Sequence, residues 1–372
     1  MSRVLIVGGG IGGMSTAIAL ARTGQQVSLI ERDEGWRALG AGLTLNGASM
    51  RVLDRLGLLD QVVEHGCGAA GTGRAHHADG SVMDEPNRER LFGPRIPNMG
   101  GIMRPVLHEI MKSAVRANNV AVRTGVTFTS LRQNDDGVSV AFSDGTEGTY
   151  DLVVGADGLF SQTRQTIMPE AKHPEFTGQG CFRAVVPRPP TQDVPAIFYG
   201  KQIVAGFNPV SKDQMYLFTL VPMPGNPFLP TERWPEFLRA SLDEFGGHIA
   251  VIRQQIDEHS LINYRPLEGI LLEDDWYRGR VLLIGDAAHA TTPHIGYGAG
   301  LSMEDGVVLA EELQNHATIE AAFAAFQRRR FARCAAVVNG SRQLGDLELA
   351  GASADVQRAV FGPLIAMIRQ EI

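Results

Sequence analysis

Four short runs of apolar residues recur along the chain, and a glycine or an acidic residue follows each of them. The runs are residues 3–7, 27–30, 151–156 and 280–284. Unbroken apolar runs of this length are typical of strands buried on both faces of a parallel sheet. Because the runs come from distant parts of the chain, the predicted sheet receives its last strand only after a long intervening segment.

Apolar residues at intervals of three and four predict amphipathic helices between these strands. The helical stretches are residues 14–21, 49–57, 104–114 and 232–245, one that opens near 301, and 319–326. The last stretch continues into four arginines, at positions 328, 329, 330 and 333, which lie largely off its apolar face. We expect these arginines on a solvated helix surface.

Other parts of the chain have the pattern of antiparallel sheet. Residues 125–150 alternate apolar and polar positions around DDG and SDGT turns, which predicts a β-meander packed on one side. Residues 66–103 are rich in glycine, asparagine, aspartate and proline, and they predict short strands and loops. From about residue 172, prolines separate short β-rich runs, and we expect a second antiparallel sheet there.

The composition is that of an ordinary, mildly acidic protein. The net charge is −7, 20% of residues are charged, and no basic tract suggests nucleic acid; the length of 372 residues suggests two domains. The three cysteines, at positions 67, 181 and 334, form neither a CxxC pair nor a metal pattern, which favours a reducing, cytoplasmic setting. We expect no membrane span, because the longest apolar stretch, residues 4–21, contains the glycines of a turn.

The most informative pattern follows the first strand. Gly8, Gly10 and Gly13 form GxGxxG between that strand and a helix, and Glu31 ends the next strand. Glycines at these positions permit a sharp turn, a close approach of a pyrophosphate and tight packing of helix on strand. The helix N-terminus attracts phosphate, and the carboxylate suits ribose hydroxyls. We predict an adenine dinucleotide, FAD or NAD; the alternative is a tight turn in another kind of α/β protein.

Two later strand ends carry comparable chemistry. Asp157 and Gly158 follow the third strand, and Asp286 follows the fourth. Ligands of open α/β sheets bind beyond the carboxyl ends of the strands, so Asp286 is placed to accept a hydrogen bond from a cofactor hydroxyl. The glycines within 296–300 leave room for a flat ring, and the next helix directs its positive end there. The alternatives are a strand-end turn at Asp157 and a glycine-rich helix cap at 296–300.

Three motifs together resemble one family, the single-component FAD-dependent aromatic hydroxylases with a p-hydroxybenzoate hydroxylase fold. The motifs are GGGIGG with Glu31, DGLFSQTR at 157–164, and GDAAHATTPHIGYGAGLSMEDG at 285–306. Arg104, in MRPVLHEIM, matches the arginine with which this family contacts FAD. The resemblance covers nearly the whole chain, and residues 200–221 look most like the urate and hydroxybenzoate hydroxylase branch.

The resemblance implies an α/β fold in which a Rossmann-like FAD-binding domain is interrupted by a β-rich substrate domain, with C-terminal helices. We expect the FAD-binding domain at 1–171 and 266–340, the substrate domain at 172–265, and a C-terminal helical segment at 341–372. The resemblance also implies that Arg164 contacts a phosphate. The FAD-binding residues that it implies are Gly8, Gly10, Ile11, Gly12, Gly13, Glu31, Arg32, Thr44, Arg104, Val126, Asp157, Gly158, Asp286, Pro293, Gly296, Gly298, Ala299 and Gly300.

The activity implied by the resemblance is oxygen insertion. FAD is reduced by NADH or NADPH, reacts with O2 to give a C4a-hydroperoxide, and hydroxylates a small aromatic or heteroaromatic substrate. The family implies a monomer or a homodimer. The alternatives are a flavin-dependent reductase or dehydrogenase on the same fold, which would not use oxygen, and a nucleotide-binding protein without catalysis.

Few residues are available to activate a substrate hydroxyl. Tyr216 aligns with a substrate-contacting tyrosine of related hydroxylases, although a core strand position is as good an explanation. His294 follows Pro293 where the family places substrate, and its alternative is a loop-capping histidine. Arg183 is a candidate to face the flavin or a substrate carboxylate, or else lies on the surface. Tyr297 is a candidate pocket residue, and we expect His289 to be structural.

Two positions depart from the pattern of the family. Many relatives carry a Pro-Asn pair in the pocket wall near the flavin ring, where this chain has Gly47 and Ala48. Urate-hydroxylating relatives have an arginine where Val204 stands here, so urate is disfavoured as a substrate.

Overall fold

The computed structural model describes residues 2–38, 40–69 and 71–372, and the four apolar runs all become strands of one sheet. Its strands lie in the order β18-β19-β12-β1-β2-β8, parallel throughout except for the antiparallel pair of β18 and β19. The prediction of a parallel sheet built from both ends of the chain is therefore confirmed. The strands are β1 (Arg3–Val7), β2 (Gln26–Glu31), β8 (Ala121–Thr124), β12 (Leu152–Gly155), β18 (Tyr277–Arg278) and β19 (Val281–Leu283).

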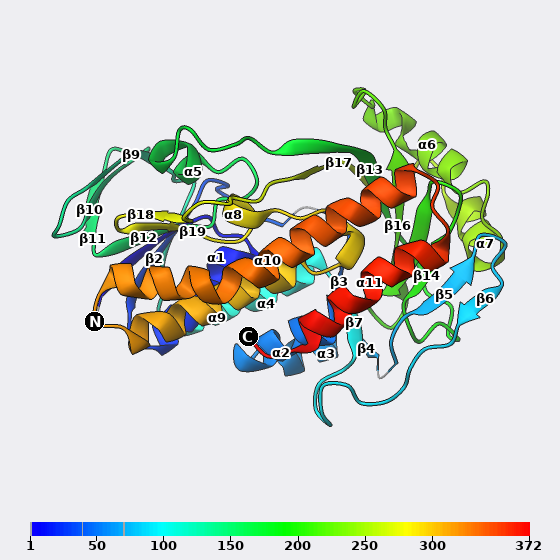
Figure 1. Cartoon of the computed structure of the whole chain (residues 1–372), viewed down its shortest axis with the longest axis horizontal. Coiled ribbons are helices and arrows are strands. Elements are labelled where there is room, and N and C mark those ends of the chain that lie inside the picture. The colour runs from blue at the N-terminus through cyan, green and yellow to red at the C-terminus, as the bar shows by residue number, and fades with distance from the viewer. Residues whose placement is uncertain (1, 39, 70) are drawn as a thin grey trace.

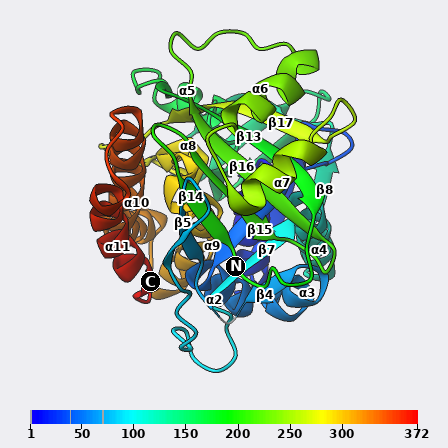
Figure 2. The ribbon, with the colours of Figure 1, turned by 90° about the vertical axis from the view of Figure 1, so that its right-hand side faces the viewer.

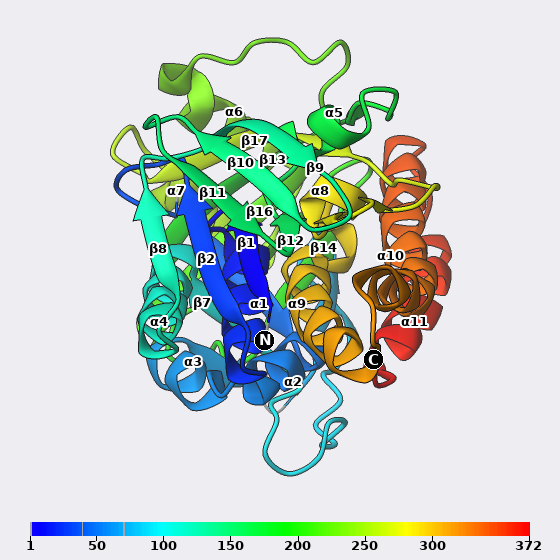
Figure 3. The same ribbon diagram turned by 90° about the vertical axis from the view of Figure 1, so that its left-hand side faces the viewer.

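This sheet is covered on both faces (Figure 3). Val4 and Ile6 of β1 pack in the core cluster that contains the apolar residues of α1, α4 and α9, whereas Leu5 and Val7 pack against the predicted β-meander. Burial on both faces explains why β1 has no alternating polar positions. The covering elements are α1 (Ile11–Arg22), α4 (Arg104–Ala117), α9 (Gly298–Asn315), β9 (Phe128–Gln133), β10 (Val138–Phe142) and β11 (Glu147–Tyr150).

Glycines let α9 lie directly against α1. A Cβ atom on Gly306 would lie 2.6 Å from the backbone nitrogen of Thr16, and a Cβ atom on Gly12 would lie 3.1 Å from Cβ of Ser302. The first and third glycine-rich motifs are therefore in contact, although almost 300 residues separate them in the chain.

A seven-stranded sheet forms the other half of the molecule, and helices α6 and α7 cover its outer face (Figure 2). Its order is β17-β13-β16-β15-β14-β5-β6. The sheet takes in residues 74–84, which our sequence boundaries placed in the first domain, because β5 pairs in parallel with β14. Its elements are β5 (Arg74–His77), β6 (Val82–Asp84), β13 (Glu175–Pro187), β14 (Ala196–Tyr199), β15 (Val204–Pro209), β16 (Gln214–Pro222), β17 (Ile262–Gly269), α6 (Trp234–Ser241) and α7 (Gly247–Gln255).

A small sheet, β3-β7-β4, lies against β15 and β16 of the large sheet. The short strands predicted within 66–103 are thus present. The elements in and around this sheet are β3 (Gly42–Asn46), β4 (Cys67–Ala69), β7 (Met99–Met103), α2 (Gly47–Arg55) and α3 (Leu59–His65). The remaining short helices are α5 (Gln162–Ile167), η1 (Thr231–Arg233), α8 (Asp286–His289) and η2 (Pro293–Ile295).

Two C-terminal helices, α10 (Ile319–Leu349) and α11 (Ala354–Arg369), run along one side of the molecule (Figure 1). Our boundary at residue 341 falls inside the continuous helix α10. The expectation of a solvated arginine surface is wrong for Arg330 and Arg333, which are buried, whereas Arg328 is exposed. The reason is that these two arginines lie where α10 packs against α9 and α11 and bond residues of those helices. In the described part of the chain, no helix is long and apolar enough to cross a membrane.

We predict that Gly306→Val separates α9 from α1 and lowers the free energy of unfolding by about 2–3 kcal/mol, because the added side chain overlaps the backbone of α1. Urea denaturation measures this loss. Gly362→Val is the matched control, since a Cβ atom on Gly362 meets nothing within 4 Å. Equal stability of the two variants would contradict the proposed close packing.

Candidate functional site

The first glycine motif forms a tight turn with an open helix end. Gly8 has φ of 107°, which L side chains rarely adopt, and a Cβ atom on Gly13 would overlap the carbonyl oxygen of Gly8. By contrast, a Cβ atom on Gly10 would meet nothing within 4 Å. Gly10 is also the N-cap of α1, where no side chain accepts the free N–H groups. These donors face open space and suit a phosphate.

A cleft of about 170 Å³ adjoins this turn. Glu31 lies in it at the end of β2, and its carboxylate accepts hydrogen bonds from the backbone N–H groups of Gly9 and Asp33, both at 2.8 Å. Burial lowers the pKa of His108, which also lines the cleft. The lining residues are Gly9, Gly10, Ile11, Glu31, Trp36, Arg37, Ala38, Arg104 and His108.

Trp36 is a cleft residue that sequence reasoning missed. Its indole Nε1 donates to the carbonyl oxygen of Gly9 at 2.8 Å, and its ring is 3% exposed. A Cβ atom on Gly9 would collide with that ring, so the second glycine of GGG is needed for packing. No periodicity marks Trp36, because the contact depends on a loop that folds back over the first turn.

The DGLFSQTR motif at 157–164 lies directly beside the first turn, since a Cβ atom on Gly8 would collide with the carbonyl oxygen of Ala156. The Asp157 carboxylate accepts from Ser161 Oγ at 2.6 Å and from the backbone N–H of Thr163 at 2.8 Å, which ties down the start of α5. The Asp157 side chain thus has the partners of a strand-end turn, the alternative that the sequence left open. Gly158, with φ of 80°, leaves open space beside it.

Arg164 has a structural position instead of the implied contact with phosphate. It is 1% exposed, and its guanidinium donates to the carbonyl oxygens of Ala287 at 2.8 Å and Leu159 at 2.7 Å. These bonds join α5 to α8. The charge is therefore held inside the protein by backbone oxygens, which explains why it is not free for a cofactor phosphate.

The third motif, at 285–306, places Asp286 after the end of β19. Asp286 is exposed, yet burial of its surroundings raises the pKa of its carboxyl, an effect that His289 and Arg104 partly offset. Further along, Gly296 has φ of 64° with open space beside it, and α9 begins at Gly298 without a capping side chain. An acceptor and a set of free N–H donors thus come from one loop.

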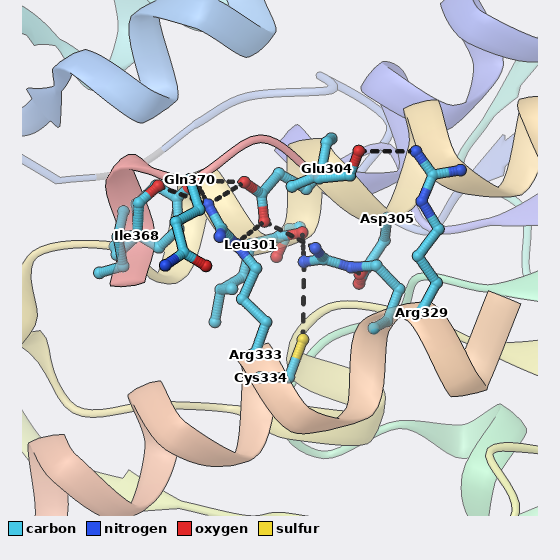
Figure 4. A network of polar contacts seen from close by, with 12 residues as sticks. Leu301, Glu304, Asp305, Arg329, Arg333, Cys334, Ile368 and Gln370 are labelled. Carbon is cyan, nitrogen blue, oxygen red and sulfur yellow. Dashed lines mark hydrogen bonds and ion pairs between the residues drawn. The ribbon is translucent and has the colours of Figure 1, made fainter. Parts of the chain in front are cut away.

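A buried network of charges supports the start of α9 (Figure 4). Glu304 bonds Arg330 at 2.7 Å and Arg333 at 2.9 Å, and it accepts a 2.5 Å hydrogen bond from the Tyr297 hydroxyl. Arg333 also donates to the carbonyl oxygen of Ile368 at 2.6 Å. Tyr297 is therefore a member of this network and 1% exposed, so the expectation that it lines the pocket is wrong.

Asp305 forms the second half of the network. Its carboxylate accepts from the backbone N–H of Gly285 at 2.8 Å, from Arg330 Nε at 2.8 Å, and from His289 Nε2 at 2.7 Å. Burial alone would lower the pKa of His289, but the Cys334 sulfur and the Asp305 carboxylate raise it well above its ordinary value. Against the effect of burial, His289 and Arg330 lower the pKa of Asp305 to about 2. The pair is a buried ion pair at neutral pH, as its structural role requires.

Among the described residues, the ligand atoms of His289, Asp305 and Cys334 lie within 4.8 Å of one another, a spacing that a metal ion would need. Arg330 already contacts two of them, with Nε 2.8 Å from Asp305 and its terminal nitrogen 3.5 Å from Cys334 Sγ. A guanidinium at this position and a protonated imidazole leave no place for a cation.

The candidate catalytic residues lie on the inner face of the seven-stranded sheet. Phe182 and Leu217 point outward into the cluster with α6 and α7, so their neighbours Arg183 and Tyr216 point inward. On this inner face Tyr216 packs with Ala41, Val210 and Met103, which come from loops and strands of three different segments.

Arg104 connects this inner face to the glycine-rich loops. Burial is the main cause that lowers its pKa, the positive charge of Arg183 adds to this effect, and Asp286 and Tyr216 oppose it. These four side chains are therefore near one another. In the part of the chain that the structure describes, the guanidinium groups of Arg104 and Arg183 have no hydrogen-bond or ion-pair partner.

His294 has its hydrogen-bond partners outside that group. Its Nδ1 lies 2.8 Å from Thr292 Oγ1, and its Nε2 lies 3.0 Å from Gln179 Oε1 and 3.3 Å from the Glu348 carboxylate. The side chain is 1% exposed. Both ring nitrogens are thus engaged inside the protein, which is the loop-capping arrangement that the sequence allowed as an alternative.

The structure shows what surrounds the two positions that depart from the family pattern, Gly47 and Val204. A Cβ atom on Gly47 would collide with the ring of Phe92, so an aromatic side chain from the 85–98 loop fills the space beside this glycine. Val204 is buried on the inner face of β15. Of the other implied FAD contacts, Arg32 is exposed, Val126 is buried near β9, and Thr44 bonds Tyr216.

The observed features fit an extended dinucleotide. Gly10 offers free N–H donors, Glu31 and Asp286 offer acceptors, and Gly296 leaves open backbone beside the start of α9. All of them lie on segments that contact one another through α1 and α9.

Comparison with known proteins agrees with this geometry. Residues 1–341 match the family model described as FAD binding domain. The chain is 31% identical to the aurachin C monooxygenase/isomerase of Stigmatella aurantiaca, over 92% of this chain and 89% of that protein. It is also 31% identical to the FAD-dependent urate hydroxylase of Mycolicibacterium vanbaalenii, over 93% and 88%. The crystal structure of Klebsiella pneumoniae HpxO with FAD and uric acid superposes with a TM-score of 0.83 at 25% identity, covering 99% of this chain and 93% of HpxO.

The fold and the site therefore define a flavoprotein of the aromatic hydroxylase class. The chain belongs to the FAD-binding family of flavin-dependent monooxygenases, and FAD is its cofactor.

We predict that Asp286→Ala weakens FAD binding roughly 10-fold, because a cofactor hydroxyl loses its acceptor. Fluorescence titration of the flavin-free protein with FAD measures the dissociation constant. Asp275→Ala, at an exposed position before β18, should bind FAD like the unchanged protein. Unaltered affinity of the Asp286 variant would reject this role.

We predict that His289→Asn destabilises the protein by about 3–5 kcal/mol at pH 6, because Asp305 keeps its charge but loses one partner. The pKa of folded His289 lies above the unfolded value of 6.5, so the stabilisation is complete below that pH and declines as the pH rises toward the folded pKa. Urea denaturation at about pH 6 and about pH 9 should show the difference from the unchanged protein narrowing. The exposed His259→Asn is the control, and a gap that stays constant or widens contradicts the ion pair.

Proposed function

We propose that this protein is an NAD(P)H-consuming monooxygenase that hydroxylates a small aromatic or heteroaromatic ring. The observation that carries the proposal is the convergence of Arg104, Arg183, Tyr216 and Asp286 between the glycine-rich loops and the inner face of the large sheet. Names of relatives support the class of substrate, since one is a urate hydroxylase and HpxO is seen with uric acid.

Bound FAD would supply the electron transfer and the activation of oxygen. Gly10, Glu31 and Asp286 would hold it, and the uncapped N-terminus of α9 would stabilise negative charge on its ring. The two guanidinium groups without partners would stabilise negative charge on a substrate oxygen or carboxylate.

In this proposal, Tyr216 accepts the proton that leaves the substrate hydroxyl. Its hydroxyl lies 2.5 Å from Thr44 Oγ1, and the side chain is 6% exposed. The linked hydroxyls can pass a proton from the substrate into the protein, which makes the ring carbon more nucleophilic. Burial of the pair keeps competing water away.

The test is a screen of hydroxybenzoates, hydroxypyridines and purines with the FAD-loaded protein, in which NADH and NADPH oxidation, oxygen uptake and product mass are recorded. A monooxygenase gives a product that carries one atom from labelled O2. A reductase or dehydrogenase works equally well without oxygen and adds no oxygen atom. Either that result or the absence of any ring-stimulated NAD(P)H oxidation would overturn the proposal.

We predict that Tyr216→Phe slows hydroxylation roughly 10²-fold and raises peroxide release for each NAD(P)H consumed, because the proton path is lost. The ratio of product to peroxide in stopped assays measures this uncoupling. Tyr150→Phe, on β11 of the meander, should leave the ratio unchanged. A Tyr216 variant with normal coupling would remove this residue from the mechanism.

A further inference from the structure

Asn208 joins Thr44 and Tyr216 in a buried polar triad on the inner face of the large sheet. Asn208 and Tyr216 are directly opposite each other on β15 and β16. The Asn208 Nδ2 atom donates to the Tyr216 hydroxyl at 3.2 Å and to Thr44 Oγ1, and the two hydroxyls bond each other. Three segments of the chain thus meet in one small hydrogen-bonded group.

The triad leaves one polar atom of Asn208 without a partner. Asn208 is 3% exposed, and its Oδ1 is buried with no hydrogen bond in the described structure. Turning the amide over does not remove the problem. The short contact between Tyr216 and Thr44 needs one hydroxyl proton, so only one more would remain for Oδ1, and neither amide proton would then have an acceptor.

Counting protons shows what the triad can offer a ligand. One amide proton points toward the two hydroxyl oxygens, and one hydroxyl proton is used between Tyr216 and Thr44. The phenol is the stronger donor of the two hydroxyls, so the proton that remains belongs to Thr44. A free donor on Thr44 therefore lies near a free acceptor, Asn208 Oδ1.

Asn208 lies on the inner face of the large sheet. Ala205 and Phe207 of β15 point into the outer cluster, so Asn208 points inward with Tyr216. Phe218 lies on the same face, partly exposed, with its ring centroid 6.0 Å from that of Tyr216. A ring that reaches the covered amide oxygen must move a neighbouring side chain, and side chains at binding surfaces commonly change rotamer when a partner binds.

We propose that Asn208, with Thr44, is a specificity-determining residue that selects rings with an adjacent N–H donor and carbonyl acceptor. A cyclic amide, such as a pyridone-type lactam, has this pair: its N–H bonds Asn208 Oδ1, and its carbonyl accepts from Thr44. The proposal deepens the proposed function, on which it rests for the position of the substrate. It differs from carboxylate recognition, which would use Arg183.

The test measures binding without turnover, so it does not depend on NAD(P)H or O2. 2-Pyridone and N-methyl-2-pyridone, together with their benzo-fused analogues, are titrated into the FAD-loaded protein while the flavin spectrum or the heat of binding is recorded. We expect the N–H compounds to bind roughly 10- to 100-fold more tightly than the N-methyl compounds. In Asn208→Leu the ratio should fall to near one.

Controls separate recognition from general damage. Asn339→Leu, at an exposed position on α10, should keep the full ratio, and flavin content and the unfolding midpoint confirm that each variant is folded. Asn208→Asp keeps the shape and an acceptor, so it should retain preference for the N–H compounds. Equal binding of both compounds, no binding of the N–H compounds, or a ratio that survives in Asn208→Leu would overturn the proposal.

The outcomes also separate this inference from the proposed function. If the lactam preference depends on Asn208 but no ring stimulates NAD(P)H oxidation, the recognition proposal stands and the monooxygenase proposal fails. If rings are hydroxylated without regard to N-methylation, the monooxygenase proposal stands and the recognition proposal fails.

Discussion

The interaction on which the rest of the site depends is the buried pairing of Glu304 and Asp305 with Arg330, Arg333 and His289. These groups hold α9 against α10 and, through Gly285, hold the start of α8. A buried charge without a partner is costly, so sliding α9 along α10 would leave acids or arginines uncompensated. The network therefore fixes where the glycine-rich loop and Asp286 stand relative to the first turn.

The two sides of the proposed site differ in composition. The cofactor side consists mainly of backbone: free N–H groups at Gly10 and at the start of α9, and glycines that permit close approach. Such donors suit phosphates and a flat ring whatever the substrate is. The opposite side consists of side chains from alternate positions of β13, β15 and β16.

On that wall, charge and neutral hydrogen bonding occupy adjacent rows. Arg183 stands opposite Phe218, whereas Tyr216 stands between Val185 and Asn208 one row away. An anionic group and a neutral polar edge of one ring would thus meet different rows.

The amino-acid sequence by itself determined the parallel sheet, the helices, the meander and the glycine turn, because each depends on local periodicity or on the backbone freedom of glycine at fixed spacing. The resemblance of three motifs also indicated the flavoprotein class. Only the tertiary structure decided the fate of individual polar side chains. Arg164, Tyr297 and His294 bind the protein itself, Arg330 and Arg333 are buried, and Asn208 joins Tyr216 across strands. These outcomes depend on partners far away in the chain, and a polar residue gives no local sign of which distant group will satisfy its hydrogen bonds.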